Sequence, residues 1–455
     1  MVADRGPAAP GGAVSLAVPR VVIAAPASGH GKTTVATGLL AALTAAGHRA
    51  AGFKAGPDYI DPGYHSLACG RPGRNLDPVL VGEELIAPLF AHGAAGSEVA
   101  IVEGVMGLYD GAVGRGDFSS TAHVAHLLDA PVVMVVDTSS QGRSVAAVLH
   151  GFRSFPGAPR ISGVILNRVG SDRHEQLLRD ACEEVGTPVL GVLRRHAVIS
   201  APSRHLGLVP AVERSAAARE SVAALAVLMA DLVEPVLSVA RTAPPLVTTP
   251  WSAPVLERAS RPVIAVAGGP AFSFGYAETT ELLTAAGADV VTFDPLRDSA
   301  LPAGTRGLVV GGGFPEVYAG ELSANTSLRA EVAALAGTGA PVAAECAGLL
   351  WLARSLDGAP MCGVLDAEAK MTETLTLGYR DAVAASDSWL APAGTRQSGH
   401  EFHRTAVTPG AGPSPAWVSA HGREGFVSGG VHASYLHLHW AARPEIAARM
   451  VAACG

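Results

Sequence analysis

The segment that most constrains the fold is a glycine-rich stretch between an apolar strand and an apolar helix. Residues 20–25 form a β-rich apolar run, and residues 33–46 have the pattern of an apolar helix. The loop between them contains Ser28, Gly29, Gly31 and Lys32, and the helical run begins with Thr33 and Thr34. Backbone N–H groups of such a loop converge on phosphates, its lysine reaches the outer phosphates, and the next hydroxyl meets Mg²⁺. The stretch predicts an ATP-binding P-loop, with an ordinary strand-to-helix turn as the alternative.

The rest of the chain predicts two α/β domains. Strands rich in Val and Ile, separated by helical pattern, indicate a parallel sheet with helices on both faces. They are expected at residues 99–102, 132–136 and 161–166, and again at 263–267, 290–293, 307–310 and 342–344. At about 100–200 residues per domain, a chain of 455 residues holds two large domains. The expected boundaries are a disordered leader at 1–18, a first domain at 19–240, a Pro-rich linker at 241–261 and a second domain at 262–455, more antiparallel from about Met361.

Charged residues after the first domain's strands predict a second part of the phosphate site. Asp58 and Asp61 stand among Gly and Pro, so we expect them in a loop rather than on a helix. Lys54 is expected to add positive charge beside the phosphates, and Glu103 ends a buried strand facing the P-loop, where an acid commonly supports Mg²⁺. The alternative is that these acids only cap turns. Asn167 also ends a strand, and either reads adenine or satisfies a turn.

A second reactive constellation is expected near Cys346. Residues 343–351 read as a strand, a tight turn and a helix, with Cys346 at the tip as in a nucleophile elbow. The helix N-terminus is expected to lower the thiol pKa, and residues 311–316 and the N–H of Ala347 could form an oxyanion hole. His437 and His439 are expected on one face of a strand, where either could be the base. The alternative for Cys346 alone is a buried structural cysteine.

Composition excludes several classes of protein. The net charge of −7 gives no support for nucleic-acid or acidic-membrane binding. The five cysteines include no C-x-x-C pair, which argues against zinc and fits a reducing cytoplasm. Residues 221–240 are apolar but contain Asp231 and Glu234, so we expect a packed amphipathic helix rather than a membrane span.

At this point the motifs resemble those of the cobyrinate/hydrogenobyrinate a,c-diamide synthase family over about residues 18–455. The matching strings are ASGHGKTT, FKAGPDYIDPGYH, VEGVMGLYDG, PSRHLGLVP, GGGFPE, AECAGLLWL and SYLHLHW, in the family's order. Cobyric acid synthase has a similar architecture but a different substrate loop. The resemblance implies a P-loop synthetase domain similar to dethiobiotin synthetase, followed by a class I glutamine amidotransferase domain.

The resemblance further implies amidation of the c and then the a carboxylate of a corrin, using ATP, Mg²⁺ and glutamine, by a cytoplasmic homodimer. Carried over residue by residue, Lys32 and Thr33 bind the ATP phosphates and Mg²⁺. Asp58, Asp61 and Glu103 match acids that serve Mg²⁺ and carboxylate activation, so the expected metal set is Thr33, Asp58 and Glu103. Cys346 matches the nucleophile and His437 its base. Related glutaminases carry His-Pro-Glu where this chain has His437-Leu-His439, so the third member is His439 or absent.

Two other functions use the same motifs. A partition-type ATPase switch with an inactive glutaminase-like domain would need the P-loop but not the thiol of Cys346. An amidotransferase for another tetrapyrrole, such as a nickel-containing sirohydrochlorin, would need both, and no motif selects the macrocycle or its metal. For the amide-forming function, we expect ammonia to pass between the domains along a path that excludes water.

Overall fold

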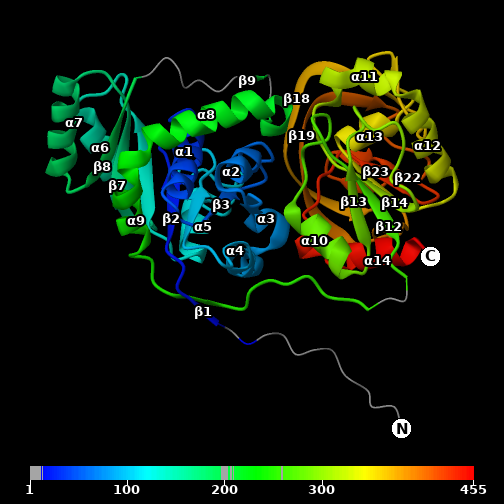
Figure 1. The fold of residues 1–455 in the computed structure, drawn as a ribbon, viewed down its shortest axis with the longest axis horizontal. Helices are drawn as coiled ribbons and strands as arrows, with labels where there is room; N and C mark the ends of the chain where they lie inside the picture. Colours follow the sequence, from blue (N-terminus) through cyan, green and yellow to red (C-terminus); the bar gives the residue numbers. More distant parts are fainter. Residues whose placement is uncertain (1–11, 13, 196–202, 205–206, 209, 258–259) are drawn as a thin grey trace, which may run out of the picture. The chain divides into compact units, whose positions relative to one another are not determined.

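The computed structural model describes residues 12, 14–195, 203–204, 207–208, 210–257 and 260–455. The chain divides into two compact units. The N-terminal unit comprises residues up to 202 together with 215–252, and the C-terminal unit comprises 203–214 and 253–455. Figure 1 shows both units as sheets flanked by helices.

The N-terminal unit is built on a seven-stranded, wholly parallel sheet in the order β4-β3-β5-β2-β6-β7-β8. The strands are β2 (Arg20–Ala24), β3 (Ala50–Ala55), β4 (Arg74–Leu76), β5 (Val99–Glu103), β6 (Val132–Asp137), β7 (Ile161–Val169) and β8 (Val189–Arg194). Every residue of β2, β3 and β5 is buried, as expected of strands covered on both faces. The predicted parallel α/β fold is therefore confirmed.

Helices connect these strands and pack on the sheet. Helix α1 packs against α2 and α8, and α6 packs against α7. The helices are α1 (Lys32–Ala45), α2 (Asp61–Cys69), α3 (Pro78–Val81), α4 (Ile86–Gly93), α5 (Thr121–Leu127), α6 (Ser144–Ser154), α7 (Asp172–Glu184), α8 (Ser215–Leu228) and α9 (Val233–Ala240), with 3₁₀ turns η1 (Glu83–Leu85) and η3 (Ala230–Leu232).

The apolar stretch at residues 221–240 is not one helix, contrary to our expectation. Helix α8 ends at Leu228, and the chain passes through η3 before α9 begins. Among the described residues, no single helix is long and apolar enough to cross a membrane. The two helical segments Ala216–Leu228 and Ala230–Ala240 are together long and apolar enough, but they are bent by 53° relative to each other.

Part of the expected leader is ordered, which corrects the prediction for residues 1–18. Strand β1 (Val14–Leu16) pairs antiparallel with β11 (Leu246–Thr248), which comes from the stretch predicted to be a linker. The buried side chain of Arg20 also holds this stretch, since its Nη2 donates to the carbonyl of Pro244 at 2.7 Å. The partners are more than 200 residues apart, so local pattern could not reveal the pairing.

The C-terminal unit contains a second, mainly parallel sheet in the order β13-β12-β14-β15-β23-β22, in which only β22 is antiparallel. Its strands are β12 (Val263–Ala267), β13 (Asp289–Phe293), β14 (Thr305–Val310), β15 (Val342–Glu345), β22 (Phe426–Ser428) and β23 (Val431–Ser434). The helices are α10 (Ala277–Ala285), α11 (Ala319–Ala324), α12 (Thr326–Gly337), α13 (Ala347–Leu352) and α14 (Glu445–Ala453), with 3₁₀ turns η2 (Ala211–Arg214), η4 (Pro315–Tyr318) and η5 (Trp440–Ala442).

A largely antiparallel sheet follows in the last third of the chain, as expected. The long strands β18 (Glu368–Ala384) and β19 (Arg396–Thr408) form an antiparallel pair. The remaining strands are β16 (Ser355–Leu356), β17 (Ala359–Pro360), β20 (Trp417–Ser419) and β21 (Gly422–Glu424), and β9 (Ser203–Arg204) pairs separately with β10 (Gly207–Leu208). The chain then returns to the parallel sheet, where β23 pairs with β15.

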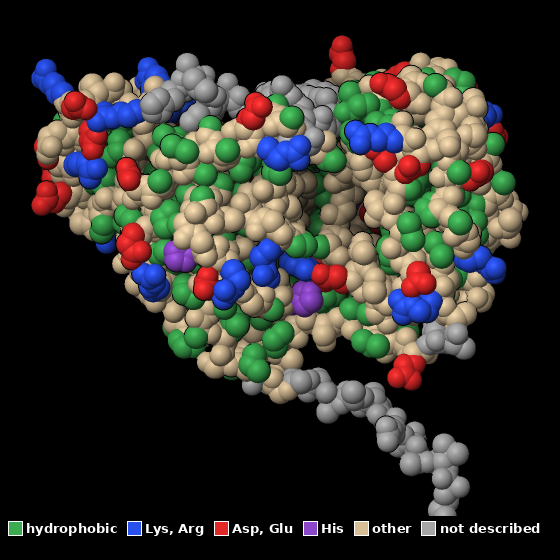
Figure 2. Space-filling model, viewed as in Figure 1, with side chains coloured by type: hydrophobic (Ala, Val, Ile, Leu, Met, Phe, Trp, Pro, Cys, Tyr) green, Lys and Arg blue, Asp and Glu red, His purple; other side chains and the backbone are tan. Residues whose placement is uncertain are grey.

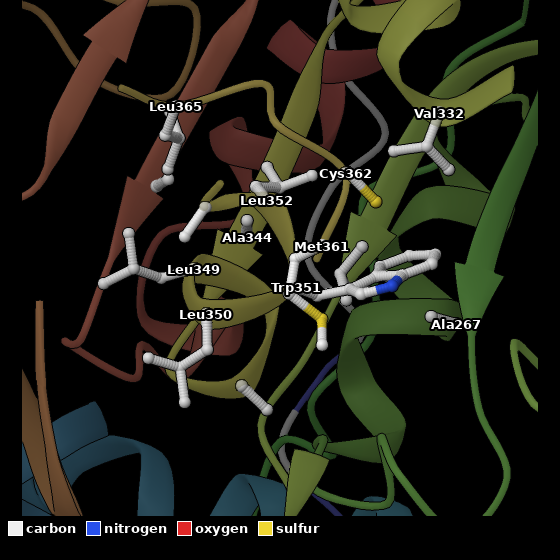
Figure 3. Close-up of a cluster of buried hydrophobic side chains, with 14 of the residues drawn as sticks. Ala267, Val332, Ala344, Leu349, Leu350, Trp351, Leu352, Met361, Cys362 and Leu365 are labelled. Atoms are coloured by element: carbon white, nitrogen blue, oxygen red, sulfur yellow. The ribbon is translucent and has the colours of Figure 1, made fainter. Parts of the chain in front are cut away.

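The core of the C-terminal unit is centred on helix α13. Figure 3 shows Trp351 of this helix beside Met361 and Cys362. The ring of Trp351 lies 5.2 Å from that of Phe272, and its carbonyl accepts a hydrogen bond from the N–H of Cys362 at 2.9 Å. Apolar residues along α13 therefore anchor the helix that directly follows Cys346.

Charges on the surface are mixed. On the face drawn in Figure 2, Lys and Arg side chains lie interspersed with Asp and Glu. Exposed ion pairs such as Arg143 with Glu184, whose charged atoms lie 2.8 Å apart, contribute little to stability because water screens them. Stability therefore comes mainly from the two cores.

Replacing Trp351 with alanine should lower the free energy of unfolding by about 3–5 kcal/mol, because the side chain is buried and a cavity would remain. Trp351→Phe is the matched control. Its effect should be smaller, roughly 1–2 kcal/mol, since Nε1 has no hydrogen-bond partner among the described residues. Urea unfolding would measure both, and equal losses would contradict a packing role.

Candidate active sites

The P-loop joins β2 to α1, as predicted. Gly29 and Gly31 have φ angles of 83° and 99°, in the region that favours glycine, and α1 begins at Lys32. A Cβ on Gly31 would lie 2.4 Å from Nδ2 of Asn167. Ser28 and Gly29 are exposed, whereas Thr33 and Thr34 are half-buried in the first turn of α1. The loop therefore opens to solvent at its tip, where a phosphate could enter.

Lys32 is a buried cation held by backbone carbonyls. Its Nζ donates to the carbonyl of Ala27 at 3.2 Å and to that of Met106. Burial, and next the nearby charge of Lys54, lower the pKa of Lys32 to about 8. A bound phosphate would add negative charge beside this ammonium and favour its charged form.

Behind the P-loop, one hydroxyl, one lysine and two acids converge from four elements. Thr33 Oγ1 donates to Glu103 Oε1 at 2.6 Å. Lys54 Nζ lies 2.5 Å from Asp61 Oδ2 and 2.8 Å from Glu103 Oε1. The ends of β3 and β5 and the starts of α1 and α2 bring these groups together, because parallel strands end at the same edge of the sheet.

Pairing decides the ionisation of this buried cluster. Burial alone would lower the pKa of Lys54, but Asp61 and Glu103 outweigh it and hold the pKa above its usual value. Burial would raise the pKa of Glu103, but Lys54 and His65 hold it well below its usual range. Burial, Asp58 and Glu103 together raise the pKa of Asp61. Because the pKa of Glu103 is lowered and that of Asp61 is raised, Glu103 is the acid of this cluster that stays ionised most readily.

His65 is a member of this site that the sequence did not single out. Its Nε2 lies 2.7 Å from Glu103 Oε2, and the ring is fully buried on α2. A Cβ on Gly52 would lie only 2.8 Å from the Cβ of His65, so the strand leaves space for the histidine. His65 lies four residues after Asp61 on one helix face, a spacing that could have indicated its role.

The two acids expected in a loop behave differently. Asp61 begins α2, which corrects that prediction; Pro62 suits a helical first turn. Asp58 precedes the helix, and its Oδ1 accepts hydrogen bonds from the N–H groups of Ile60 and Asp61 at 2.8 and 2.9 Å. That carboxylate oxygen therefore serves the turn. Lys54 lies between carboxylates, where Asp61 and Glu103 balance its charge.

The donor set fits Mg²⁺ bound together with phosphates. No group of three or more His, Cys, Asp or Glu that could hold a metal ion occurs in the part of the chain that the structure describes. Mg²⁺ at phosphate sites commonly takes only one or two protein oxygens and completes its shell with phosphate and water. Thr33 and Glu103 offer oxygens of this kind, 2.6 Å apart.

Asn167 supports the loop instead of leaving its amide open. Its Nδ2 donates to the carbonyl of His30 at 2.9 Å, and its Oδ1 accepts the N–H of Arg168 at 2.9 Å. Asp137, at the neighbouring strand end, forms an ion pair with Arg168. Of the motif at residues 202–210, residues 202, 205, 206 and 209 lie outside the described residues.

Cys346 stands at a strained turn between β15 and α13, as the elbow pattern predicted. Its φ and ψ angles are 49° and −101°, a combination that costs a non-glycine residue about 1–3 kcal/mol. Its N–H donates to the carbonyl of Ser434 at 2.8 Å, and the N–H of Gly348 donates to Gly311 at 3.1 Å. A Cβ on Gly348 would lie 2.3 Å from the carbonyl oxygen of Val310. The turn is therefore held tightly against neighbouring strands.

The thiol is not acidic in this state, contrary to the expectation from the helix N-terminus. Burial, and next the charge of Glu316, raise the pKa of Cys346 to about 12. The N–H of Ala347 forms a hydrogen bond that opposes this rise but does not overcome it. Helix α13 has only six residues, and desolvation outweighs its dipole.

His437 lies beside Glu345, the residue before Cys346, but not on a regular strand, which corrects the expected geometry. Strand β23 ends at Ser434, and His437 forms a single antiparallel bridge with His400. A Cβ on Gly312 would lie 2.4 Å from Cε1 of His437, so the glycine turn makes room for the ring. Burial, His400 and His403 lower the pKa of His437 to about 3, which leaves a neutral imidazole.

The histidine pair separates into two environments. His439 stacks on Tyr276 with ring centroids 4.1 Å apart, and its Nε2 lies 3.8 Å from Glu278 of α10. His437 directs Nδ1 toward Glu345, whose Oε2 is 3.8 Å away. Glu345 was not among the predicted site residues, although an acid directly before the nucleophile is visible in the sequence. Of the predicted oxyanion donors, the N–H of Gly312 is already bonded to Phe274.

Comparison with known proteins matches both units. Residues 21–209 match the CobQ/CobB/MinD/ParA nucleotide binding domain, and residues 263–445 match the CobB/CobQ-like glutamine amidotransferase domain. A hydrogenobyrinate a,c-diamide synthase of Streptomyces coelicolor is 62% identical over 96% of this chain and 98% of its own length. One of Mycobacterium tuberculosis is 55% identical over 96% and 98%. A cobyrinate a,c-diamide synthase of Gloeobacter violaceus is 45% identical over 95% and 96%.

Alkylation of Cys346 by iodoacetamide should be slow at neutral pH and rise about tenfold per pH unit up to pH 10. The raised pKa, about 12, keeps most of the thiol protonated up to pH 10, so the reactive thiolate fraction rises about tenfold with each pH unit. Mass spectrometry of the Cys346 peptide would give the rate. The buried Cys454 in the same digest reports on unfolding and should stay unmodified. A plateau between pH 7 and 8 would show an acidic thiol instead.

Proposed function

Because this chain belongs to the hydrogenobyrinate/cobyrinate a,c-diamide synthase family, we propose that it amidates the c and a carboxylates of such a corrin with ATP and glutamine. The observation that carries the proposal is 62% identity, over nearly the whole of both chains, to a protein of that name. The two reactive loops support it, since one suits phosphoryl transfer and the other amide hydrolysis. Each amidation would consume one ATP and one glutamine.

The N-terminal unit would activate the carboxylate. A carboxylate is a poor electrophile, so a substrate oxygen attacks the γ-phosphorus of ATP, ADP leaves, and an acyl phosphate forms. Lys32 and the N–H groups of residues 28–34 would hold the phosphates, with Lys32 compensating charge on the transferring group. Thr33 and Glu103 would hold Mg²⁺, which offsets phosphate charge when bound. Lys54 and His65 would keep Glu103 ionised and in place.

Asp58 and Asp61 would act on the substrate side of this site. Asp61 is buried between Lys54 and Thr33, and its raised pKa makes its charge sensitive to nearby cations. Asp58 shapes the turn that begins α2. We propose that Asp61 supports the acyl phosphate electrostatically and that Asp58 holds Asp61 in position.

The C-terminal unit would release ammonia from glutamine. Sγ of Cys346 attacks the side-chain amide carbon, its proton passes to His437, and His437 returns that proton to the departing nitrogen. Ammonia leaves and a thioester remains. Water, deprotonated by His437, then hydrolyses the thioester to glutamate and restores the thiol. Both groups are neutral in the free enzyme, so the thiol still carries the proton that passes to His437 as Sγ attacks.

Ammonia would then complete the amide. Its nitrogen attacks the carbonyl carbon of the acyl phosphate, phosphate leaves with the C–O bond electrons, and the nitrogen loses a proton. We place the enzyme in the cytoplasm, which fits five free thiols, and expect a homodimer from the family.

Cys346→Ser should abolish glutamine-dependent amidation and largely preserve amidation driven by ammonium chloride at pH 8–9. A serine hydroxyl is a far weaker nucleophile than a thiol here, while the N-terminal unit is unchanged. Product formation with each nitrogen donor would be followed by mass spectrometry.

The control for this change is Cys454→Ser, a buried cysteine of the same unit whose Sγ donates to the carbonyl of Met450 at 3.3 Å. A serine can keep that bond, so both activities should persist. Loss of ammonia-driven amidation in Cys346→Ser, with Cys454→Ser active, would contradict the division of labour.

Hydrogenobyrinate is the favoured substrate, since the relatives at 62% and 55% identity carry its name and the cobyrinate enzyme is at 45%. Incubation of the purified protein with each corrin, ATP, Mg²⁺ and glutamine should convert hydrogenobyrinate by two successive amidations. Faster conversion of cobyrinate would reassign the substrate, and no change in either would overturn the function. Trapping of Cys346 by a glutamine analogue separates this function from an ATPase switch, which needs no reactive thiol.

A further inference from the structure

Two pairs of an acid and a histidine lie among the described residues of the C-terminal unit, and one of them includes the histidine assigned as base. Glu278 lies 3.8 Å from His439, and Glu345 lies 3.8 Å from His437. The ring of His439 is stacked on Tyr276 of the segment before α10. These contacts place His439 beside α10, where Glu278 is its acidic neighbour. His439 is therefore not needed as the third member that orients His437.

We propose that Glu345 is the positioning acid of the glutaminase, in place of the downstream acid of related enzymes. This inference rests on the proposed function of Cys346 and His437. Glu345 ends β15, directly before the nucleophile, so one short segment would carry both the thiol and the acid.

The carboxyl group of Glu345 contacts the segment that carries His437 at several points. It accepts hydrogen bonds from the backbone N–H of Leu438 and from the side chain of Trp440, and it faces Nδ1 of His437. Its Oε1 is buried and has no hydrogen-bond partner among the described residues. Oε1 therefore has capacity left for a further donor, whereas Nδ1 of His437 faces the other oxygen, Oε2, at 3.8 Å.

This arrangement selects the useful tautomer of the imidazole. A proton on Nδ1, directed at Glu345, makes Nε2 the unprotonated nitrogen, which is the one that accepts the thiol proton. Cε1, which lies between the two ring nitrogens, is the ring atom nearest to a Cβ built on Gly312, followed by Nε2. Burial raises the pKa of Glu345 to about 8, so this acid is mainly ionised above that pH. There, when Nε2 takes the proton from Sγ, the imidazolium charge forms beside the carboxylate, which stabilises it. No covalent step at Glu345 is needed.

The test compares Glu345→Gln, which keeps the shape but not the charge, with Glu345→Asp and Glu278→Gln in the full-length chain. For Glu345→Gln, kcat of glutamine hydrolysis should fall about 10²–10⁴-fold. KM for glutamine and ammonia-driven amidation should stay within about threefold, because the residue acts through His437 and not on the substrate. Glu345→Asp should recover at least about tenfold of the loss.

Glu278→Gln is the matched control, since it alters the other acid–histidine pair, and glutaminase kcat should stay within about threefold. A parent-like kcat in Glu345→Gln would overturn the inference, as would a loss confined to Glu278→Gln. If Glu345→Gln also loses ammonia-driven amidation, its fold is affected, and Glu345→Asp then decides. A reduced kcat with intact ammonia use supports the inference, and an unchanged kcat refutes it. Absence of glutaminase activity in the parent would instead refute the proposed function.

Discussion

Parallel strand pairing is the constraint on which both reactive centres depend. In each unit the strands end at a common edge, so residues far apart in the chain meet there. At this edge of the first sheet, β2 leads into the P-loop while β3 and β5 deliver Lys54 and Glu103. In the second sheet, β15 delivers Glu345 and Cys346, and β23 leads toward His437. Without these two edges the motifs would be unconnected loops.

The two centres manage burial in opposite ways. The N-terminal centre keeps ions and pairs them, with Lys54 between Asp61 and Glu103 and His65 behind Glu103. Unpaired buried charge is costly, and the cluster avoids this cost by pairing its charges with one another. The C-terminal centre keeps its groups neutral, because burial raises the pKa of Cys346 and lowers that of His437. Such a centre develops charge only as the reaction proceeds.

Much of the fold followed from local pattern. Buried Val- and Ile-rich runs located the main strands, and the glycine pattern before Lys32 located the P-loop. The elbow at Cys346 was also visible, since a strand, a small-residue turn and a helix follow one another there. Three local features misled. The apolar stretch of α8 and α9 concealed a break, Asp61 began a helix where Gly and Pro suggested a loop, and the helix N-terminus suggested an acidic thiol.

By itself, the sequence determined which chemical groups exist and in which order they occur: a phosphate loop, buried acids, a cysteine elbow and a histidine pair. These depend on neighbours within a few residues, and the same residues carried the family resemblance. Only the tertiary structure decided which groups meet. In the folded chain β1 pairs with β11, and His65 lies against Glu103. His437 lies beside Glu345, and His439 lies beside Glu278. The physical reason is that pairing and burial depend on distances in space, which residue spacing along the chain does not encode.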